Sequence, residues 1–206
     1  MHPRTSRFLP GSAASLIPAI ALSVAACTQT AETPPPAGQP APVAPFSAPA
    51  IASMAMVTNN AEIQESQIAL QRSTNESVRQ FAQRMVTDHQ YLNQQLGRVM
   101  SEERIGSEMI PLSQQVQDES RNAQQTLQGL SGADFDRAYI DRQIQLHEWA
   151  ISMIDDTLLP SATNSDLRSV LETTRATMSE HLQQARQIRA TLNQSNQGGS
   201  GHHGHH

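Results

Sequence analysis

The stretch from Phe81 to Val99 constrains the fold most, because its apolar side chains recur at steps of three and four residues. This spacing places them on one face of an α-helix. His89 occupies a position in this apolar stripe where an aliphatic side chain is expected. The pattern predicts an amphipathic helix that buries one histidine. The stripe consists of Val78, Phe81, Ala82, Met85, His89, Leu92, Leu96 and Val99.

The same replacement occurs in two later segments. His147 fills a stripe position in a helix predicted over residues 134–159, and His181 fills one in a helix predicted over 165–193. Three helices therefore each direct one histidine toward the interior. Neutral imidazole is the commonest protein metal ligand, and it costs free energy to bury without a partner. The three histidines therefore form a candidate metal site.

The remaining helical pattern predicts an all-α fold. Aromatic residues make up 3% of the 206-residue chain, which suits long helices better than a β-sandwich or barrel. Four long helices with one long connection indicate a ferritin-like up-down four-helix bundle. An extra short helix is expected in the connection between the second and third long helices. The long helices are predicted over 51–72, 76–104, 134–159 and 165–193, and the short one over 112–129.

The amino terminus has the features of an export signal. Residues 1–26 combine a basic head, a short apolar run and small residues before Cys27. Val24-Ala25-Ala26-Cys27 resembles a bacterial lipobox, in which the cysteine becomes the lipidated first residue of the exported protein. Lipidation would anchor the protein to a membrane without crossing it. Thr28, in place of aspartate, favours the outer membrane with the domain facing the periplasm. The alternative is an ordinary signal peptide and a soluble periplasmic or secreted protein.

Composition divides the rest of the chain. Residues 27–49 are rich in proline and alanine and predict a semi-rigid tether. Residues 50–194 form the predicted helical domain, and the Gly/Ser/His-rich residues 195–206 a disordered tail. The net charge of −5 gives the chain no electrostatic attraction to nucleic acid. The single cysteine excludes an internal disulfide and a multi-cysteine zinc site.

Further ligands would determine which metal binds. Glu62 or Glu65 from the first helix could complete the set. No Glu-x-x-His motif occurs, which argues against a carboxylate-rich di-iron site. Met85 and Met178 each precede a histidine by one helical turn. A ligand set of thioether and imidazole groups favours copper over iron. Alternatively, both methionines simply fill the core. Copper, zinc and iron all remain candidate ions.

Each inward histidine has an acidic neighbour in sequence, namely Asp88, Glu148 and Glu180. Adjacent residues of a helix point about 100° apart, so these acids cannot share the ligand face. They could instead hydrogen-bond a histidine of the next helix and fix its tautomer. Their alternative role is that of ordinary solvated acids. The histidines themselves are either metal ligands or members of a buried hydrogen-bond network.

The chain resembles the bacterial ferritin-like family known as domain of unknown function four-one-four-two, whose members are often labelled outer-membrane proteins. The clearest signature is Phe-Ala-x-Arg-Met at residues 81–85, followed by Asp88-His89, and the likeness covers about residues 50–190. This resemblance implies a ferritin-like bundle, export and frequent lipidation, and no established reaction. The candidate site residues that this resemblance implies are Glu62, Asp88, His89, His147 and His181.

The sequence therefore predicts an exported, membrane-anchored helical lipoprotein that binds or buffers a metal ion. The alternative is a structural or stress-related envelope protein that binds an unidentified protein partner. An enzyme is less favoured, because the sequence contains no nucleophile elbow, phosphate-binding loop or Cys-His pair.

Overall fold

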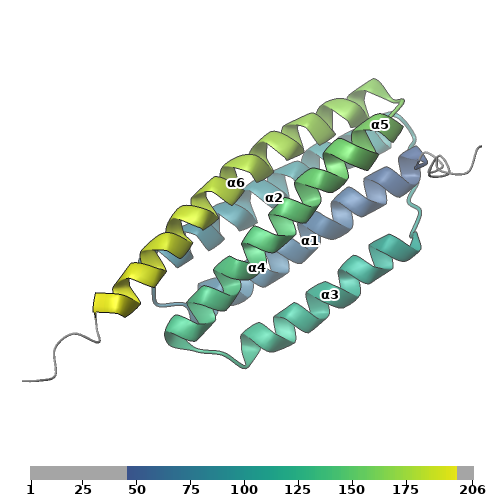
Figure 1. The fold of residues 1–206 in the computed structure, drawn as a ribbon. Helices are drawn as coiled ribbons and strands as arrows, with labels where there is room; N and C mark the ends of the chain where they lie inside the picture. The colour runs from purple at the N-terminus through teal and green to yellow at the C-terminus, as the bar shows by residue number, and fades with distance from the viewer. Residues whose placement is uncertain (1–45, 199–206) are drawn as a thin grey trace, which may run out of the picture. The chain divides into compact units, whose positions relative to one another are not determined.

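The computed structural model describes residues 46–198, and the side chains of residues 46–194. Within this range all regular structure is helical, which confirms the predicted all-α class. None of the described helices is both long and apolar enough to cross a membrane. The elements are α1 (Ala48–Arg72), α2 (Glu76–Glu102), α3 (Pro111–Gln128), α4 (Gly132–Met153), the π-helical η1 (Ile154–Leu158), α5 (Leu159–Ser161) and α6 (Ser165–Gly198) (Figure 1).

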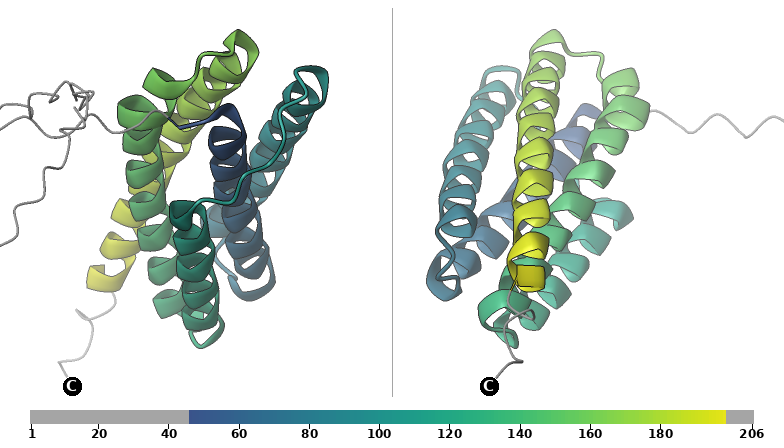
Figure 2. Two further views of the ribbon diagram at one scale, coloured as in Figure 1. Left: turned by 90° about the vertical axis from the view of Figure 1, so that its right-hand side faces the viewer. Right: turned by 60° about the vertical axis from the view of Figure 1, so that its left-hand side comes forward.

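The long helices α1, α2, α4 and α6 pack side by side around a common interior. Helix α1 contacts α2, α2 contacts α6, α6 contacts α4, and α4 contacts α1, so the contacts close into a ring. Figure 2 shows α6 between α2 and α4 in its right-hand view. The short helix predicted in the long connection is α3, which lies along α1 outside this ring. Helices α2 and α4, on either side of that connection, run in the same direction (Figure 1).

Several helix ends differ from their predicted positions. Helix α1 begins at Ala48, within the predicted tether, because the Ser47 side chain accepts a hydrogen bond from the Ala50 N–H and caps the helix. The helix predicted to end before Pro160 continues through η1 to Ser161. A wider π-helical turn precedes the proline, whose ring clashes with the preceding turn of a regular α-helix. Helix α6 extends to Gly198, into the predicted tail.

Ser73 and Glu76 have the spacing of a capping box, which predicts that Ser73 caps α2. Asn75 caps the helix by accepting a hydrogen bond from the Val78 N–H. The Ser73 hydroxyl instead donates to the Asp136 carboxylate, 2.6 Å away on α4. A tertiary contact has therefore replaced the predicted local one. The predicted export signal, Cys27, and most of the predicted tether and tail lie outside the described residues.

The interior consists of two apolar clusters with a polar layer between them. One polar residue of each long helix lies in this layer, namely Glu62, His89, His147 and His181, and each is fully buried. On every one of these helices, the members of one cluster come before that position and the members of the other come after it. The first cluster includes Ile51, Met54, Leu96, Ile154, Leu167 and Leu171, and the second includes Ala69, Phe81, Phe135, Tyr139, Ile140 and Ala185.

Candidate metal centre

The three predicted histidines converge inside the bundle. Each can offer one ring nitrogen such that all three nitrogens lie within 4.8 Å of one another. Their ring centroids are 5.4 to 6.0 Å apart, and all three residues are 0% exposed. Because each histidine comes from a different helix, the packing of α2, α4 and α6 determines this arrangement.

The outer ring nitrogens face hydrogen-bond acceptors. His147 Nδ1 lies 2.8 Å from the backbone carbonyl oxygen of Gln143, and His181 Nε2 lies 2.8 Å from Oδ2 of Asp88. His89 Nδ1 lies 3.0 Å from Oδ1 of Asn59, whose amide nitrogen donates to Asn93. An imidazole donates to such acceptors, so the outer nitrogen of each ring carries its proton.

The inner nitrogens are consequently lone-pair acceptors. His147 Nε2 faces His181 Nδ1 at 3.4 Å, and with the outer nitrogens protonated neither can donate to the other. His89 Nε2 is buried and has no hydrogen-bond partner. Three convergent lone pairs without a donor among them fit a cation. Three imidazole nitrogens are a donor set that transition-metal ions prefer.

Burial keeps the imidazoles in the neutral form that binds metals. It lowers the pKa of His89 well below the usual value, and the neighbouring His147 and His181 lower it further. Burial, with a smaller contribution from His181, lowers the pKa of His147 to about 3. Burial also lowers the pKa of His181, and it outweighs the opposing influence of Asp88. All three rings are therefore neutral at physiological pH.

Glu62, a predicted ligand, lies behind one of the histidines. Its Oε1 atom is 3.3 Å from His147 Nδ1, the ring nitrogen opposite the one that faces His181. Both carboxylate oxygens lack a hydrogen-bond partner. Burial, reinforced by nearby Glu65, raises the pKa of Glu62 well above its usual value. The structure therefore does not bring Glu62 into the group of convergent nitrogens.

The family of the chain follows from its sequence over this same region. A family model described as "Domain of unknown function (DUF4142)" matches residues 31–188. The chain belongs to this family. The resemblance expected from the sequence is confirmed, and the match includes every residue of the histidine centre of this DUF4142 chain. Neither a curated protein nor a solved structure matches the chain.

Glu65, the alternative ligand from the first helix of the DUF4142 chain, is held by an arginine. Its two carboxylate oxygens accept hydrogen bonds from Arg142 of α4, each at 3.2 Å. Gln143 Nε2 is 3.4 Å from the same carboxylate. Burial raises the pKa of Glu65, whereas Arg142 opposes that rise. The Glu65 side chain thus compensates the charge of Arg142 and is not brought to the convergent imidazole nitrogens.

The two candidate methionine ligands pack on opposite sides of the histidine layer. Met85 belongs to the apolar cluster around Phe81, and Met178 belongs to the cluster around Leu171. Both side chains are at most 2% exposed. Their packing accounts for their burial, and their participation in metal binding stays a prediction.

Among the three acids adjacent to histidines, the structure brings Asp88 to a histidine of another helix, His181. Glu148 lies at the surface and pairs with Arg186, 2.7 Å away. Glu180 lies at the surface as well and pairs with Arg84. The difference arises because α2 turns Asp88 toward α6, whereas the other two acids point away from the interior.

Two groups that orient the histidines were not foreseen from the sequence. Asn59 precedes Glu62 by one turn of α1, and it is 1% exposed. The Gln143 carbonyl group precedes His147 by one turn of α4. Asn59 could have been identified from the sequence as a polar residue on the otherwise apolar face of α1. A backbone acceptor leaves no signal, because every residue has one.

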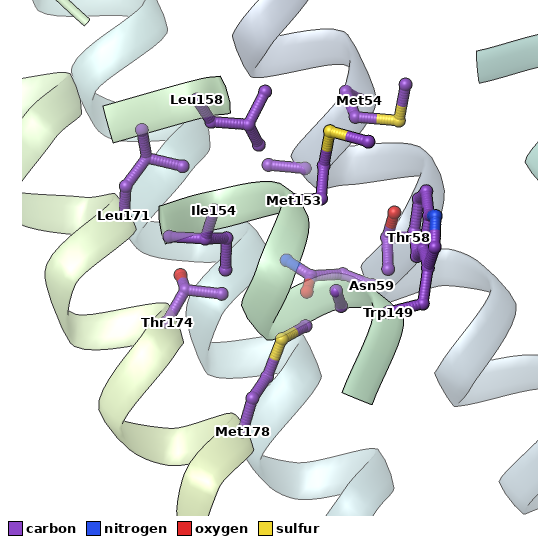
Figure 3. Close-up of a pocket in the computed structure, with 12 residues that line it drawn as sticks. Met54, Thr58, Asn59, Trp149, Met153, Ile154, Leu158, Leu171, Thr174 and Met178 are labelled. Atoms are coloured by element: carbon purple, nitrogen blue, oxygen red, sulfur yellow. The ribbon is translucent and has the colours of Figure 1, made fainter. Parts of the chain in front are cut away.

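A small cavity lies in the next layer of the bundle, toward the α5 end (Figure 3). Its volume is about 20 Å³, enough for about one water molecule. Its wall includes Asn59, which contacts His89, and Met178, which precedes His181 by one turn. Residues of η1 form another part of the wall. Space for about one water molecule is therefore present next to the histidine layer.

Proposed function

We propose that this DUF4142 domain binds one transition-metal ion through His89 Nε2, His147 Nε2 and His181 Nδ1. The observation that carries the proposal is the convergence of three neutral imidazole lone pairs with no donor among them. The outer hydrogen bonds support it, because such bonds orient histidine ligands and raise their basicity. Three imidazoles suit zinc, copper, nickel or iron, and such a set leaves a coordination position open.

A buried hydrogen-bond network is the weaker account of the same residues. The acceptors on Asn59, Gln143 and Asp88 satisfy the outer nitrogens only. Leaving a buried polar atom unsatisfied costs roughly 1–3 kcal/mol. A network without a cation leaves the inner nitrogens with that penalty, whereas a bound metal ion removes it.

The bundle architecture is proposed to be ferritin-like. Its support is the parallel direction of α2 and α4 and the long connection, containing α3, that joins them. Ferritin-like bundles place metal ligands on facing helices, as this proposal requires.

The chain is further proposed to be an exported lipoprotein of the bacterial outer membrane, anchored through Cys27 and facing the periplasm. The support is the lipobox-like Val24-Ala25-Ala26-Cys27 after an apolar, basic-headed segment. The wild-type chain should incorporate radiolabelled fatty acid, and the labelled protein should sediment with membranes. A Cys27→Ser variant should lose the label. Equal labelling of the variant would contradict the anchor.

Metal binding is tested on the purified full chain after removal of bound ions with a chelator. The four tail histidines of residues 202–206 are replaced by alanine in every protein, because they could bind metal by themselves. Calorimetric titration with Zn(II), Cu(II), Cu(I) and Fe(II) should show one equivalent of at least one ion. The His89→Ala/His147→Ala variant should lose it. Uptake that is absent, or unchanged in the double variant, refutes the proposal.

A further inference from the structure

Within the described part of the chain, the buried side-chain polar atoms without hydrogen-bond partners lie in the histidine layer or one helical turn from it. Among the described side chains these atoms are Nε2 of His89, both carboxylate oxygens of Glu62 and Oε1 of Gln143. A metal ion bound by the three histidines would satisfy the His89 nitrogen. The Glu62 carboxylate needs a separate explanation, because burying a charged group without a partner is costly.

The charges around Glu62 narrow that explanation. Glu65 forms a two-pronged contact with Arg142, so the negative charge of Glu65 is compensated. Glu62 forms no salt bridge with an arginine, although the charge of Arg142 opposes the rise of its pKa. Its ion-pair contact is with His147 Nδ1, at 3.3 Å. The imidazole ring of His147 therefore separates the Glu62 carboxylate from the proposed metal position. A cation at that position is the natural counter-charge, and the attraction favours Glu62 as a carboxylate.

A second acid has the same relation to another ligand. Asp88 Oδ2 lies 2.8 Å from the outer nitrogen of His181. Asp88 is partly exposed and also contacts Arg84, so its charge acts on the centre less strongly than that of Glu62. Two of the three ligands thus each have a carboxylate at the outer ring nitrogen. The attraction of these carboxylates, chiefly that of Glu62, increases with the charge of the bound ion.

We propose that Glu62, acting through His147, makes the three-histidine centre select a divalent transition-metal ion over a monovalent one such as Cu(I). The inference rests on the proposed metal-binding function and identifies the charge class of the ion. Glu62 is a positioning residue here, since it contacts the ligand and not the ion. Coulomb attraction is proportional to the charge of the ion, so its loss weakens divalent binding more than monovalent binding.

The test compares Glu62→Gln with Glu148→Gln in the full chain that lacks tail histidines. Glu148 is the matched control, because it follows His147 in sequence but lies at the surface and pairs with Arg186. Affinities for Zn(II) and for Ag(I), a redox-inert monovalent probe for a Cu(I) site, are measured by competition. Loss of a carboxylate behind a metal-bound histidine costs about 10- to 100-fold in affinity. We expect that loss for Zn(II) in Glu62→Gln.

The attraction of a monovalent ion is half as large, so Ag(I) affinity should fall only about 3- to 10-fold by the same principle. The Zn(II)-to-Ag(I) affinity ratio should thus fall about 3- to 10-fold in Glu62→Gln and stay unchanged in Glu148→Gln. Thermal melting verifies that both variants are folded. If Glu62→Gln is not, Asp88→Asn should lower the ratio in the same direction.

Two outcomes separate this inference from the proposed function. A wild-type chain that binds one Zn(II), with an unchanged ratio in Glu62→Gln, overturns the selectivity alone. A wild-type chain that binds neither of these ions, nor Cu(II), Cu(I) or Fe(II), overturns the metal centre and the selectivity together.

Discussion

The neutral, buried state of His147 makes the metal-free protein sensitive to acid. The pKa of this imidazole is about 3 in the folded chain, against an ordinary value of 6.5. The folded form therefore excludes a proton that the unfolded form accepts below pH 6.5. The contribution of neutral His147 to the free energy of unfolding is fully present above pH 6.5 and is lost as the pH falls toward 3. Below pH 3 both forms bind the proton, and this contribution changes no further.

The size of the effect follows from the same two values. Between pH 7 and pH 5, His147 alone should reduce the free energy of unfolding by about 2 kcal/mol. The total loss near pH 3 should be about 5 kcal/mol. Glu62 has the opposite effect on the pH dependence of stability. Its pKa is raised in the folded chain, so the folded form binds a proton at a higher pH than the unfolded form does and becomes more stable as the pH falls. A Glu62→Gln background removes this opposing contribution.

The assay is urea unfolding followed by circular dichroism, with chelator present, at pH 7 and pH 5. The two proteins compared are Glu62→Gln and Glu62→Gln/His147→Leu, both without tail histidines. The first should lose about 2 kcal/mol more than the second between the two pH values. Equal losses in the two proteins would refute the argument that His147 is held neutral by burial.

Three further perturbations test the interior and the orientation of the ligands. Phe81→Ala should reduce the free energy of unfolding in urea by about 3–5 kcal/mol, because the Phe81 ring is fully buried in the core; a loss below about 1 kcal/mol would contradict its role there. Arg142→Met should reduce the free energy of unfolding by about 3–5 kcal/mol, because it leaves the buried Glu65 carboxylate unpaired. Arg186→Met removes an exposed ion pair and should reduce it by less than about 1 kcal/mol. Similar losses in the two variants would show that burial does not set the strength of the Arg142–Glu65 pair. Asn59→Leu removes the acceptor for His89 Nδ1 and should weaken Zn(II) binding about 10- to 100-fold in a competition titration, and unchanged affinity would mean that this hydrogen bond does not fix the ligand.

The repeat of apolar side chains predicted the long helices and the inward position of each histidine. That success has a local cause, since a helical period of 3.6 residues requires no knowledge of the rest of the fold. The residue that caps a helix was predicted less accurately where a tertiary contact competes with local capping. Ser73, for example, contacts Asp136 of α4 in place of capping α2.

Which atoms meet in the interior depended on the tertiary structure. Sequence spacing treated Asp88, Glu148 and Glu180 alike, but the rotation of the helices brings Asp88 to a histidine. It offered Glu62 or Glu65 as a ligand from the first helix, but the register of α1 against α4 places the Glu62 carboxylate at the outer nitrogen of His147. The sequence by itself thus determined which three histidines are buried in the polar layer. Only the relative rotation and register of the packed helices decided which nitrogens converge and which acceptors hold the protons on the others.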